Sequence, residues 1–200
     1  MAAELKPRLT FDEYLEIESK AEFKSEFVNG WMYAMAGASP EHNLITANVV
    51  IEIGKQIQRP PCAIYSGDQL LKVLARANGR YPDVTVVCGE PQYHKSPFLN
   101  ALLNPTLLVE VLPPITEAHG RNVKVEEYRK AEEYRSIPSL KEYLLIAQSR
   151  YHVEHYVRRA SNQWLLSEYN GSQNVIRLAA INCDLSLAEV YKMVPAPEAK

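Results

Sequence analysis

Two runs of aliphatic and β-branched residues, 81–87 and 107–112, each carry a single carboxylate, Asp83 and Glu110. Runs without polar alternation are typical of strands buried on both faces of a sheet. A lone acid in such a strand is costly unless something pairs with it. We therefore expect the two strands to be neighbours, with the two acids, 27 residues apart, sharing one divalent cation.

Local signals predict the elements before these strands. Thr10 and Glu13 form a capping box that opens a helix. Asn29-Gly30 predicts a hairpin turn between residues 26–28 and 31–35. Ser39 and Pro40 open a second helix, which ends at Pro60-Pro61. Residues 63–66 and 70–75 are predicted to be strands.

The rest of the chain alternates between loop, helix and strand signals. Residues 89–104 predict a long polar loop, and residues 123–136 a charged helix that contains a six-residue duplication. Strands are expected at 142–147, 152–158, 163–169 and 175–179, and a final helix at 185–193. The pattern predicts an α/β fold with a mixed sheet, as a single domain over residues 1–200.

The composition narrows the class of protein. With 46% hydrophobic and 23% charged residues, the 200-residue chain can build a sizeable core. A net charge of -2 excludes a strongly basic nucleic-acid binder, but not a nuclease whose bound cation meets the phosphate. Three widely spaced cysteines indicate reduced, buried thiols. The sequence has neither an apolar leader nor a membrane span, so we expect a cytoplasmic protein.

The two acids suit metal-assisted phosphodiester hydrolysis. A hard cation takes carboxylate and carbonyl oxygens, polarises the phosphate and activates water. A nearby lysine can neutralise the charge that develops. By pattern alone an alternative stands: Asp83 caps a turn after Pro82, and Glu110 pairs with a buried arginine.

Six segments in order resemble a known family. They are SEFVNGWMYAMAGASPEHN, YSGDQLLKV, YPDVTVVCGEP, LLNPTLLVEVLPPITEA, YRSIPSLKEYLLIAQ and WLLSEY. The chain is similar, from about residue 8 to 194, to a bacterial family of restriction-endonuclease-like proteins in the PD-(D/E)XK nuclease superfamily, long labelled only as a domain of unknown function. The resemblance implies a restriction-endonuclease-like mixed central β-sheet flanked by α-helices.

The resemblance also implies a site. Asp83 matches the motif aspartate and Glu110 the (D/E)xK glutamate, so both are expected to bind Mg²⁺ or Mn²⁺, with the backbone carbonyl of Val111 as a third ligand. Glu26 matches an accessory acid, with a solvated charge before a turn as the alternative. Asp68 also falls in a family motif, with a turn aspartate beside Gly67 as the alternative.

His42 matches a family histidine. It could touch Glu26 or the substrate, or it could be a histidine at the edge of the core, satisfied by a carbonyl. His152 and His155 have a spacing that suggests a metal pair, but residues i and i+3 of a strand point to opposite faces. We therefore expect no shared metal between these two histidines.

The chain departs from the family pattern at the lysine. Leu112 occupies the lysine position of ExK, and the family supplies its lysine from the following helix. The duplication makes both Lys124 and Lys130 candidates. Six residues turn a helix by about 600°, equivalent to ~240°, so both cannot face the site; we favour Lys124, which is nearer in sequence to Glu110. Pro113 and Gly120 replace a serine and an aspartate usual in the family.

Three functions are consistent with the sequence. The first is a metal-dependent endonuclease that cleaves DNA, acting as a homodimer whose edge is formed by residues 152–158 and 163–169. The second is a catalytically impaired nuclease fold that serves as a nucleic-acid-binding or assembly module, as the departures at Leu112, Pro113 and Gly120 suggest. The third is a hydrolase of RNA or of a small phosphorylated substrate. Tyr128, Tyr134 and their basic neighbours could contact a phosphate backbone or form a solvated amphipathic helix.

Overall fold

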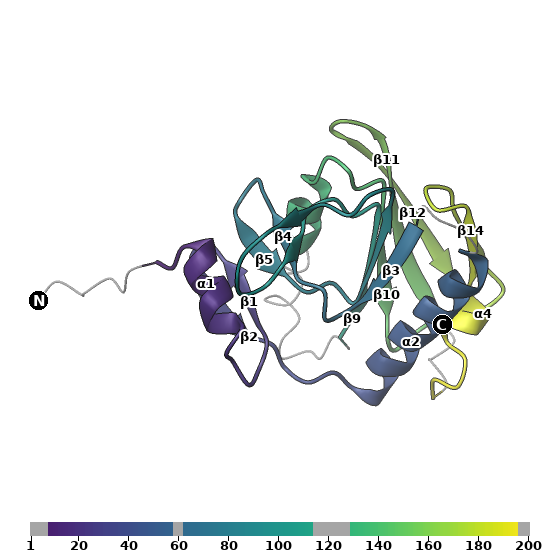
Figure 1. Ribbon diagram of the computed structural model, residues 1–200. Coiled ribbons are helices and arrows are strands. Elements are labelled where there is room, and N and C mark those ends of the chain that lie inside the picture. Colours follow the sequence, from purple (N-terminus) through teal and green to yellow (C-terminus); the bar gives the residue numbers. More distant parts are fainter. Residues whose placement is uncertain (1–7, 58–61, 114–128, 196–200) are drawn as a thin grey trace, which may run out of the picture.

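A computed structural model describes residues 8–57, 62–113 and 129–195 (Figure 1). The helices are α1 (Phe11–Glu18), α2 (Pro40–Gln56) and α4 (Leu187–Val190), and residues 129–135 are also helical. The strands are β1 (Ser25–Val28), β2 (Trp31–Ala34), β3 (Cys62–Ser66), β4 (Leu71–Val73), β5 (Asn78–Arg80), β6 (Val84–Cys88), β7 (Tyr93–His94), β8 (Ala101–Leu102), β9 (Leu107–Leu112), β10 (Glu142–Ala147), β11 (His152–Ala160), β12 (Gln163–Asn170), β13 (Val175–Leu178) and β14 (Cys183–Ser186).

The central sheet has six strands in the order β12-β11-β10-β9-β6-β3. It is mixed: β9 and β10 run parallel, and the other neighbours are antiparallel. The two aliphatic runs that open the sequence argument become β6 and β9, which pair directly. The expected α/β class with a mixed central sheet is thus what the structure has.

The sequence predicted one mixed sheet, whereas the described residues form more. A second six-stranded sheet has the order β2-β1-β5-β4-β8-β7, and β13 and β14 form a separate hairpin. The predicted loop 89–104 contains the short strands β7 and β8. Strands of two residues leave no periodic signal, and the pairing of β8 with β4 is a long-range contact, so the sequence pattern could not indicate β8 or its partner β7.

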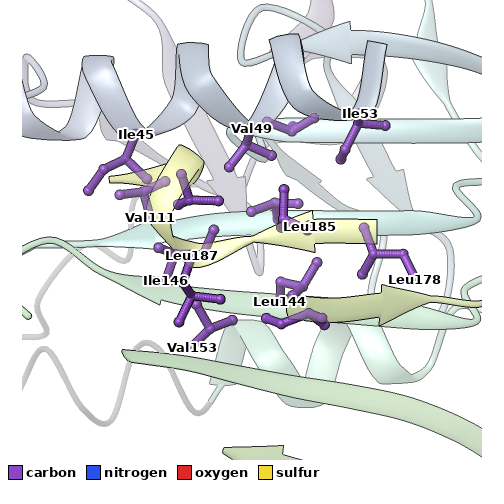
Figure 2. Close-up of a cluster of buried hydrophobic side chains, with 14 of the residues drawn as sticks. Ile45, Val49, Ile53, Val111, Leu144, Ile146, Val153, Leu178, Leu185 and Leu187 are labelled. Carbon is purple, nitrogen blue, oxygen red and sulfur yellow. The ribbon is translucent and has the colours of Figure 1, made fainter. Parts of the chain in front are cut away.

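One face of the central sheet is covered by α2, the β13–β14 hairpin and α4. Figure 2 shows Ile45, Val49 and Ile53 of α2 pointing toward aliphatic side chains of the sheet and of the hairpin. These three residues are fully buried. They recur at the helical spacing that predicted α2, so this apolar stripe is the reason that the helix docks here.

The opposite face of the central sheet holds the second sheet and helix 129–135. Ala131 and Tyr134 of that helix pack with Leu108 of β9, Tyr143 of β10 and Leu71 of β4. The N-terminal helix α1 covers the second sheet in turn, through a cluster of buried aromatic and aliphatic side chains. Helix 129–135 therefore lies where the two sheets meet. No helix within the described ranges is long and apolar enough to cross a membrane.

Local signals predicted the first elements correctly. Thr10 and Glu13 form both hydrogen bonds of the capping box. Ser39 accepts a hydrogen bond from the backbone N–H of His42 and caps α2, with Pro40 as its first residue. Asn29 and Gly30 adopt φ values of 51° and 87°, as a type I′ hairpin turn requires, between β1 and β2.

The predicted C-terminal helix 185–193 is wrong in its first turn. Residues 183–186 form β14 instead, and the helix α4 begins at Leu187. Buried and exposed positions alternate along β14, which pairs with β13. Alternation with a period of two residues is typical of a strand, and pairing with β13 makes this segment a strand and not the first turn of a helix.

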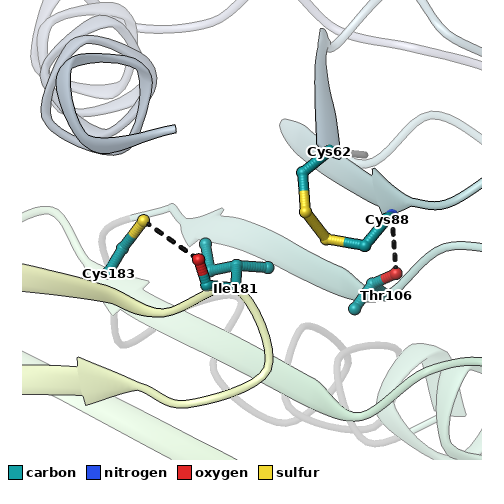
Figure 3. The surroundings of a disulfide bond; sticks show 5 residues. All are labelled: Cys62, Cys88, Thr106, Ile181 and Cys183. Carbon is teal, nitrogen blue, oxygen red and sulfur yellow. Dashed lines mark hydrogen bonds between the residues drawn. A yellow bond between two sulfur atoms is a disulfide. The ribbon is translucent and has the colours of Figure 1, made fainter. Parts of the chain in front are cut away.

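The expectation of three reduced thiols is also wrong. Cys62 and Cys88 form a disulfide that joins β3 to β6, and only Cys183, of the three, is a free and buried thiol (Figure 3). The two bonded cysteines are directly opposite each other in the register of the two strands. Their 26-residue separation in sequence gives no sign of that pairing. The bond fastens the edge strand β3 to the core strand that follows Asp83.

We predict that the double substitution Cys62→Ser/Cys88→Ser lowers the free energy of unfolding by about 3 kcal/mol, because the cross-link restricts the unfolded chain. Urea denaturation of the oxidised protein and of the variant measures the difference. Thiol titration in denaturant provides the control: one thiol, that of Cys183, should react before reduction, and three after it. Three reactive thiols before reduction would contradict the prediction.

Candidate active site

Asp83 and Glu110 lie side by side because β6 and β9 are antiparallel neighbours. Val84 pairs with Val109, and the same register continued by one residue places Asp83 opposite Glu110. Glu110 alternates with the core residues Val109 and Val111 and points to the opposite face of the sheet, where helix 129–135 packs. The strands thus bring together the two acids that the sequence singled out.

Asp83 is held by a strand and by a helix. The backbone N–H of Val111 donates a hydrogen bond to Asp83 Oδ2 at 2.6 Å. His42 Nε2 lies 3.1 Å from Asp83 Oδ1. This hydrogen bond raises the pKa of His42 above its ordinary value, against the effect of burial. Of the alternatives that the sequence left open for His42, the contact with Glu26 is not among its described contacts; its ring contacts Asp83 instead.

Glu110 is buried, with a residue exposure of 9%. Burial raises its pKa to about 7, and Lys130 opposes that rise. The hydroxyl of Tyr134 donates a hydrogen bond to Glu110 Oε1 at 2.7 Å. Lys130 Nζ lies 3.7 Å from the same oxygen. One carboxylate oxygen is therefore tied to helix 129–135.

Lys130 lies between two carboxylates. Its Nζ forms an ion pair with Glu26 Oε1 at 2.8 Å in addition to the contact with Glu110. Burial alone would lower the pKa of Lys130, but these two carboxylates outweigh it and raise the pKa above its ordinary value. Although burial favours a higher pKa for Glu26, the charges of Lys130 and Arg80 hold that pKa below its ordinary value.

The duplicated helix thus brings Lys130 to the acids. Lys124, the lysine that the sequence argument favoured, lies outside the described residues, as does Gly120. Leu112, in the lysine position of the ExK motif, is partly buried and packs with the cluster around helix 129–135. Pro113 follows the end of β9. The cation beside Glu110 therefore comes from the helix and not from the strand.

Arg80 anchors Glu26 and the helix to each other. Its guanidinium forms a two-pronged contact with Glu133, at 3.1 Å for each prong, and a third contact of 2.7 Å with Glu26 Oε2. Arg80 and Glu133 are almost fully buried. Two carboxylates and a fork-shaped cation at this spacing form strong, directional hydrogen bonds. Because Glu133 shares a helix with Lys130, the Arg80 contacts also position that lysine.

Asp68 does not join this group of side chains. It lies in the turn after β3, its side chain is 81% exposed, and its carboxylate pairs with Lys24. This contact favours the turn aspartate that the sequence left open as an alternative. The neighbouring Gly67 packs against the backbone of Asp83, so the turn is close to the site although its acid points away.

Arg80 and Glu133 were not predicted from the sequence as site residues, and Tyr134 was predicted only as a possible phosphate contact or as part of a solvated helix. The sequence left open a pairing of Glu110 with a buried arginine; the arginine is present, but its described partners are Glu26 and Glu133. The sequence did contain one sign that Tyr134 lies in the site: Lys130 and Tyr134 are four residues apart and therefore share a face of the helix. The charged residues around them suggested a solvated helix. That face is buried because the second sheet packs there, which the local sequence does not indicate.

The residues present fit a divalent cation. Among the described residues, Glu26, Asp83, Glu110 and Glu133 supply four carboxylates, which exceed the two permanent cations Arg80 and Lys130 by two. Glu26 and Glu133 are committed to those cations. Asp83 and Glu110 remain, on adjacent strands, as the two carboxylates available to a hard cation, which commonly completes its shell with water. The carbonyl of Val111, beside both acids, stays a predicted third ligand.

Comparison with known proteins places the chain in a family. Residues 11–189 match the model of the Uma2 family, described as "Putative restriction endonuclease". The chain belongs to this family. It is 37% identical over 171 residues to the uncharacterized protein sll1609 of Synechocystis (strain PCC 6803), covering 86% of this chain and 93% of that one. It is 29% identical over 186 residues to slr1290 of the same organism, covering 93% of each chain.

A solved structure shares the fold. It is the crystal structure of a protein from Anabaena variabilis, titled a putative nuclease, which aligns with a TM-score of 0.71 over 94% of this chain and 99% of that one. Sequence identity is 15%, so the likeness establishes the architecture alone. The resemblance that the ordered motifs suggested, and the restriction-endonuclease-like fold that it implied, are confirmed by the family match and by this structure.

We predict that Glu133→Ala lowers the free energy of unfolding by about 3 kcal/mol, because it removes one partner of a buried ion pair and leaves Arg80 under-compensated. Urea denaturation measures the change. The neighbouring Glu132→Ala is the matched control: Glu132 is 54% exposed and contacts an equally accessible Arg76, so its loss should cost under about 1 kcal/mol. Equal losses in the two variants would contradict the role given to Arg80 and Glu133.

Proposed function

We propose that the protein is a divalent-metal-dependent endonuclease that hydrolyses phosphodiester bonds of DNA. One observation carries the proposal: a carboxylate pair on adjacent strands, Asp83 and the buried Glu110, with the ammonium group of Lys130 3.7 Å from Glu110. Two acids and a lysine are the groups that metal-assisted phosphoryl chemistry uses. Membership of the Uma2 family, described as "Putative restriction endonuclease", supports the same proposal.

Each side chain has a part in this proposal. Asp83, Glu110 and the Val111 carbonyl would hold Mg²⁺ or Mn²⁺. When bound, the ion would polarise the phosphate and make water acidic enough to attack it. Asp83 is oriented for this by the Val111 N–H and by His42. Glu110 is oriented by Tyr134, which leaves its second oxygen free of any described hydrogen bond.

Lys130 would act on the phosphate as a charge. Glu26 and Glu110 keep it in its ammonium form, so it is suited to neutralise the negative charge that grows on the phosphate oxygens. Glu26 is a positioning residue here, since its described contacts are with Lys130 and Arg80 and not with the metal-binding acids Asp83 and Glu110. With Lys130 in this role, the substitution of Leu112 in the ExK motif does not deprive the site of a cation.

The first test is cleavage of supercoiled plasmid DNA with Mg²⁺ or Mn²⁺. We expect nicking that needs the added cation, and a roughly 1,000-fold slower rate for Asp83→Ala and for Glu110→Gln, because each loses a metal ligand. Calorimetric titration with Mn²⁺ should show weaker binding in both variants. Full cleavage by Asp83→Ala would rule out this assignment of the site. Cleavage assays with RNA substrates separate a DNA-specific nuclease from an RNA hydrolase.

Lys130→Met tests the lysine. We expect a roughly 100-fold lower cleavage rate, the usual effect of losing one charge-stabilising group, with Mn²⁺ affinity kept or increased because a competing cation is gone. Arg129→Met is the matched control, since Arg129 is the adjacent residue of the same helix and is exposed. It should cleave at close to the wild-type rate. A wild-type rate in Lys130→Met would move the role to another lysine, Lys124 first.

The competing function is a nuclease fold retained as a nucleic-acid-binding or assembly module. The aliphatic Leu112 and the loss of the serine at Pro113 favour it. Under this reading the wild-type protein binds DNA without added cation and cleaves none with Mg²⁺, Mn²⁺ or Co²⁺. Retention of Mn²⁺ binding by wild type and its loss in Glu110→Gln would argue for the enzyme instead.

A homodimer is the assembly that we propose for this nuclease. The strand β12 is an eight-residue edge of the central sheet, and its side chains Leu165 and Leu166 are 44% and 45% exposed. Long edge strands with apolar side chains tend to pair with another strand. Two copies joined along this edge would present two sites, as cutting both strands of a duplex requires.

A further inference from the structure

A second group of metal-binding side chains lies on β11 and β12, away from Asp83. His152, Glu154 and Glu168 each offer one ligand atom, and these atoms lie within 4.8 Å of one another. His152 and Glu154 alternate on β11 and share a face, and Glu168 is directly opposite Glu154 on β12. We propose that this group binds one Zn²⁺ ion.

The histidine is the residue that distinguishes this group from an exposed acidic patch. The His152 side chain is 9% exposed. Its Nδ1 is 2.9 Å from Asn170 Oδ1, which is a hydrogen-bond acceptor, so the ring proton belongs on Nδ1. The lone pair of Nε2 then points to Glu154 Oε1, which at 3.9 Å is beyond hydrogen-bond reach. An imidazole whose second nitrogen donates to an oxygen is the usual arrangement of a metal ligand.

The first carboxylate is held in the same way. Tyr156 donates a hydrogen bond from its hydroxyl to Glu154 Oε2 at 2.7 Å, which leaves Oε1 toward His152. The second carboxylate, Glu168, is exposed and can adjust. In tetrahedral zinc sites, ligand atoms about 2 Å from the metal are roughly 3.3 Å apart. A modest rotation of the Glu168 side chain therefore closes the group around an ion.

Electrostatics favour a cation at this point. Glu154 and Glu168 are a directly opposed cross-strand pair, and like charges in that position destabilise a sheet. A bound divalent cation turns this repulsion into an attraction that joins the edge strand β12 to β11. One imidazole and two carboxylates suit Zn²⁺ better than Mg²⁺, which prefers oxygen ligands throughout. A fourth position is left for water.

The proposed zinc site is separate from the nuclease site. In the central sheet, Glu110 pairs with Leu145, Leu145 with Glu154, and Glu154 with Glu168. Glu110 and Glu154 are thus two strands apart, which is about 9.6 Å, with the side chain of Leu145 between them. Paired metals that act on one phosphate are about 4 Å apart. The two sites point to the same face of the sheet, but they do not form a two-metal centre.

The experiment is a zinc titration of the full chain with a chromophoric chelator as competitor, in wild type and in an Asp83→Asn/Glu110→Gln background. We expect one Zn²⁺ per chain to remain bound in that background, whether or not the protein is a nuclease. Glu168→Gln, which alters an exposed side chain, should weaken zinc binding by at least about 10-fold, and Asn170→Ala by about 10-fold through loss of its hold on His152. In the Asp83→Asn/Glu110→Gln background, zinc should raise the melting temperature, and adding Glu168→Gln should reduce that rise.

Two control variants make the result specific. His94→Ala removes the histidine that pairs with Asp12 on the second sheet, and Glu132→Gln removes an exposed acid from helix 129–135. Both should bind zinc as wild type does. The proposal is overturned if the background variant holds no stoichiometric zinc, which would leave His152, Glu154 and Glu168 as neighbouring side chains without a shared ion. It is equally overturned if Glu168→Gln binds zinc as tightly as the controls.

Discussion

The buried guanidinium of Arg80 is the contact on which the candidate site depends. It lies on β5 of the second sheet and contacts Glu26 of β1 and Glu133 of helix 129–135. Burying a charge is costly unless its partners satisfy it, and here two carboxylates do so with short, directional contacts. The helix therefore docks in one position, and that position places Lys130 and Tyr134 over Glu110. A helix held by apolar packing alone could slide without such a penalty.

The same network explains why a cation suits the site. Arg80 and Lys130 neutralise Glu26 and Glu133, and among the described residues Asp83 and Glu110 keep only His42, Tyr134 and the longer 3.7 Å contact of Lys130. Burial has already raised the pKa of Glu110 to about 7, which is what a carboxylate short of positive charge shows. A divalent ion would supply the missing charge. The cations of the protein itself thus orient the helix, and the acids Asp83 and Glu110 on the sheet stay available to a ligand.

Features that depend on local chemistry could be predicted from the sequence. Caps, the Asn29-Gly30 turn and the unbroken aliphatic runs of β6 and β9 follow from a few adjacent residues, and Asp83 and Glu110 stood out because they interrupt such runs. Features that depend on register could not. The Cys62–Cys88 bond, the division into two sheets and the pairing of Arg80 with Glu133 each join residues far apart in sequence. Nothing in the neighbouring residues indicates which partner is opposite.

The position of the site lysine depends both on a local sequence motif and on long-range packing. Leu112 follows Glu110 by two residues on β9, so its side chain shares the face of the sheet on which a motif lysine would stand. Instead it packs against the apolar cluster to which Ala131 and Tyr134 of the helix also belong. An aliphatic residue at this position therefore adds to the apolar cluster on which the helix packs, and the helix carries Lys130 to Glu110. The substitution that removes a lysine from the strand is thus part of the packing that supplies one from the helix, so the sequence motif alone understates what the site contains.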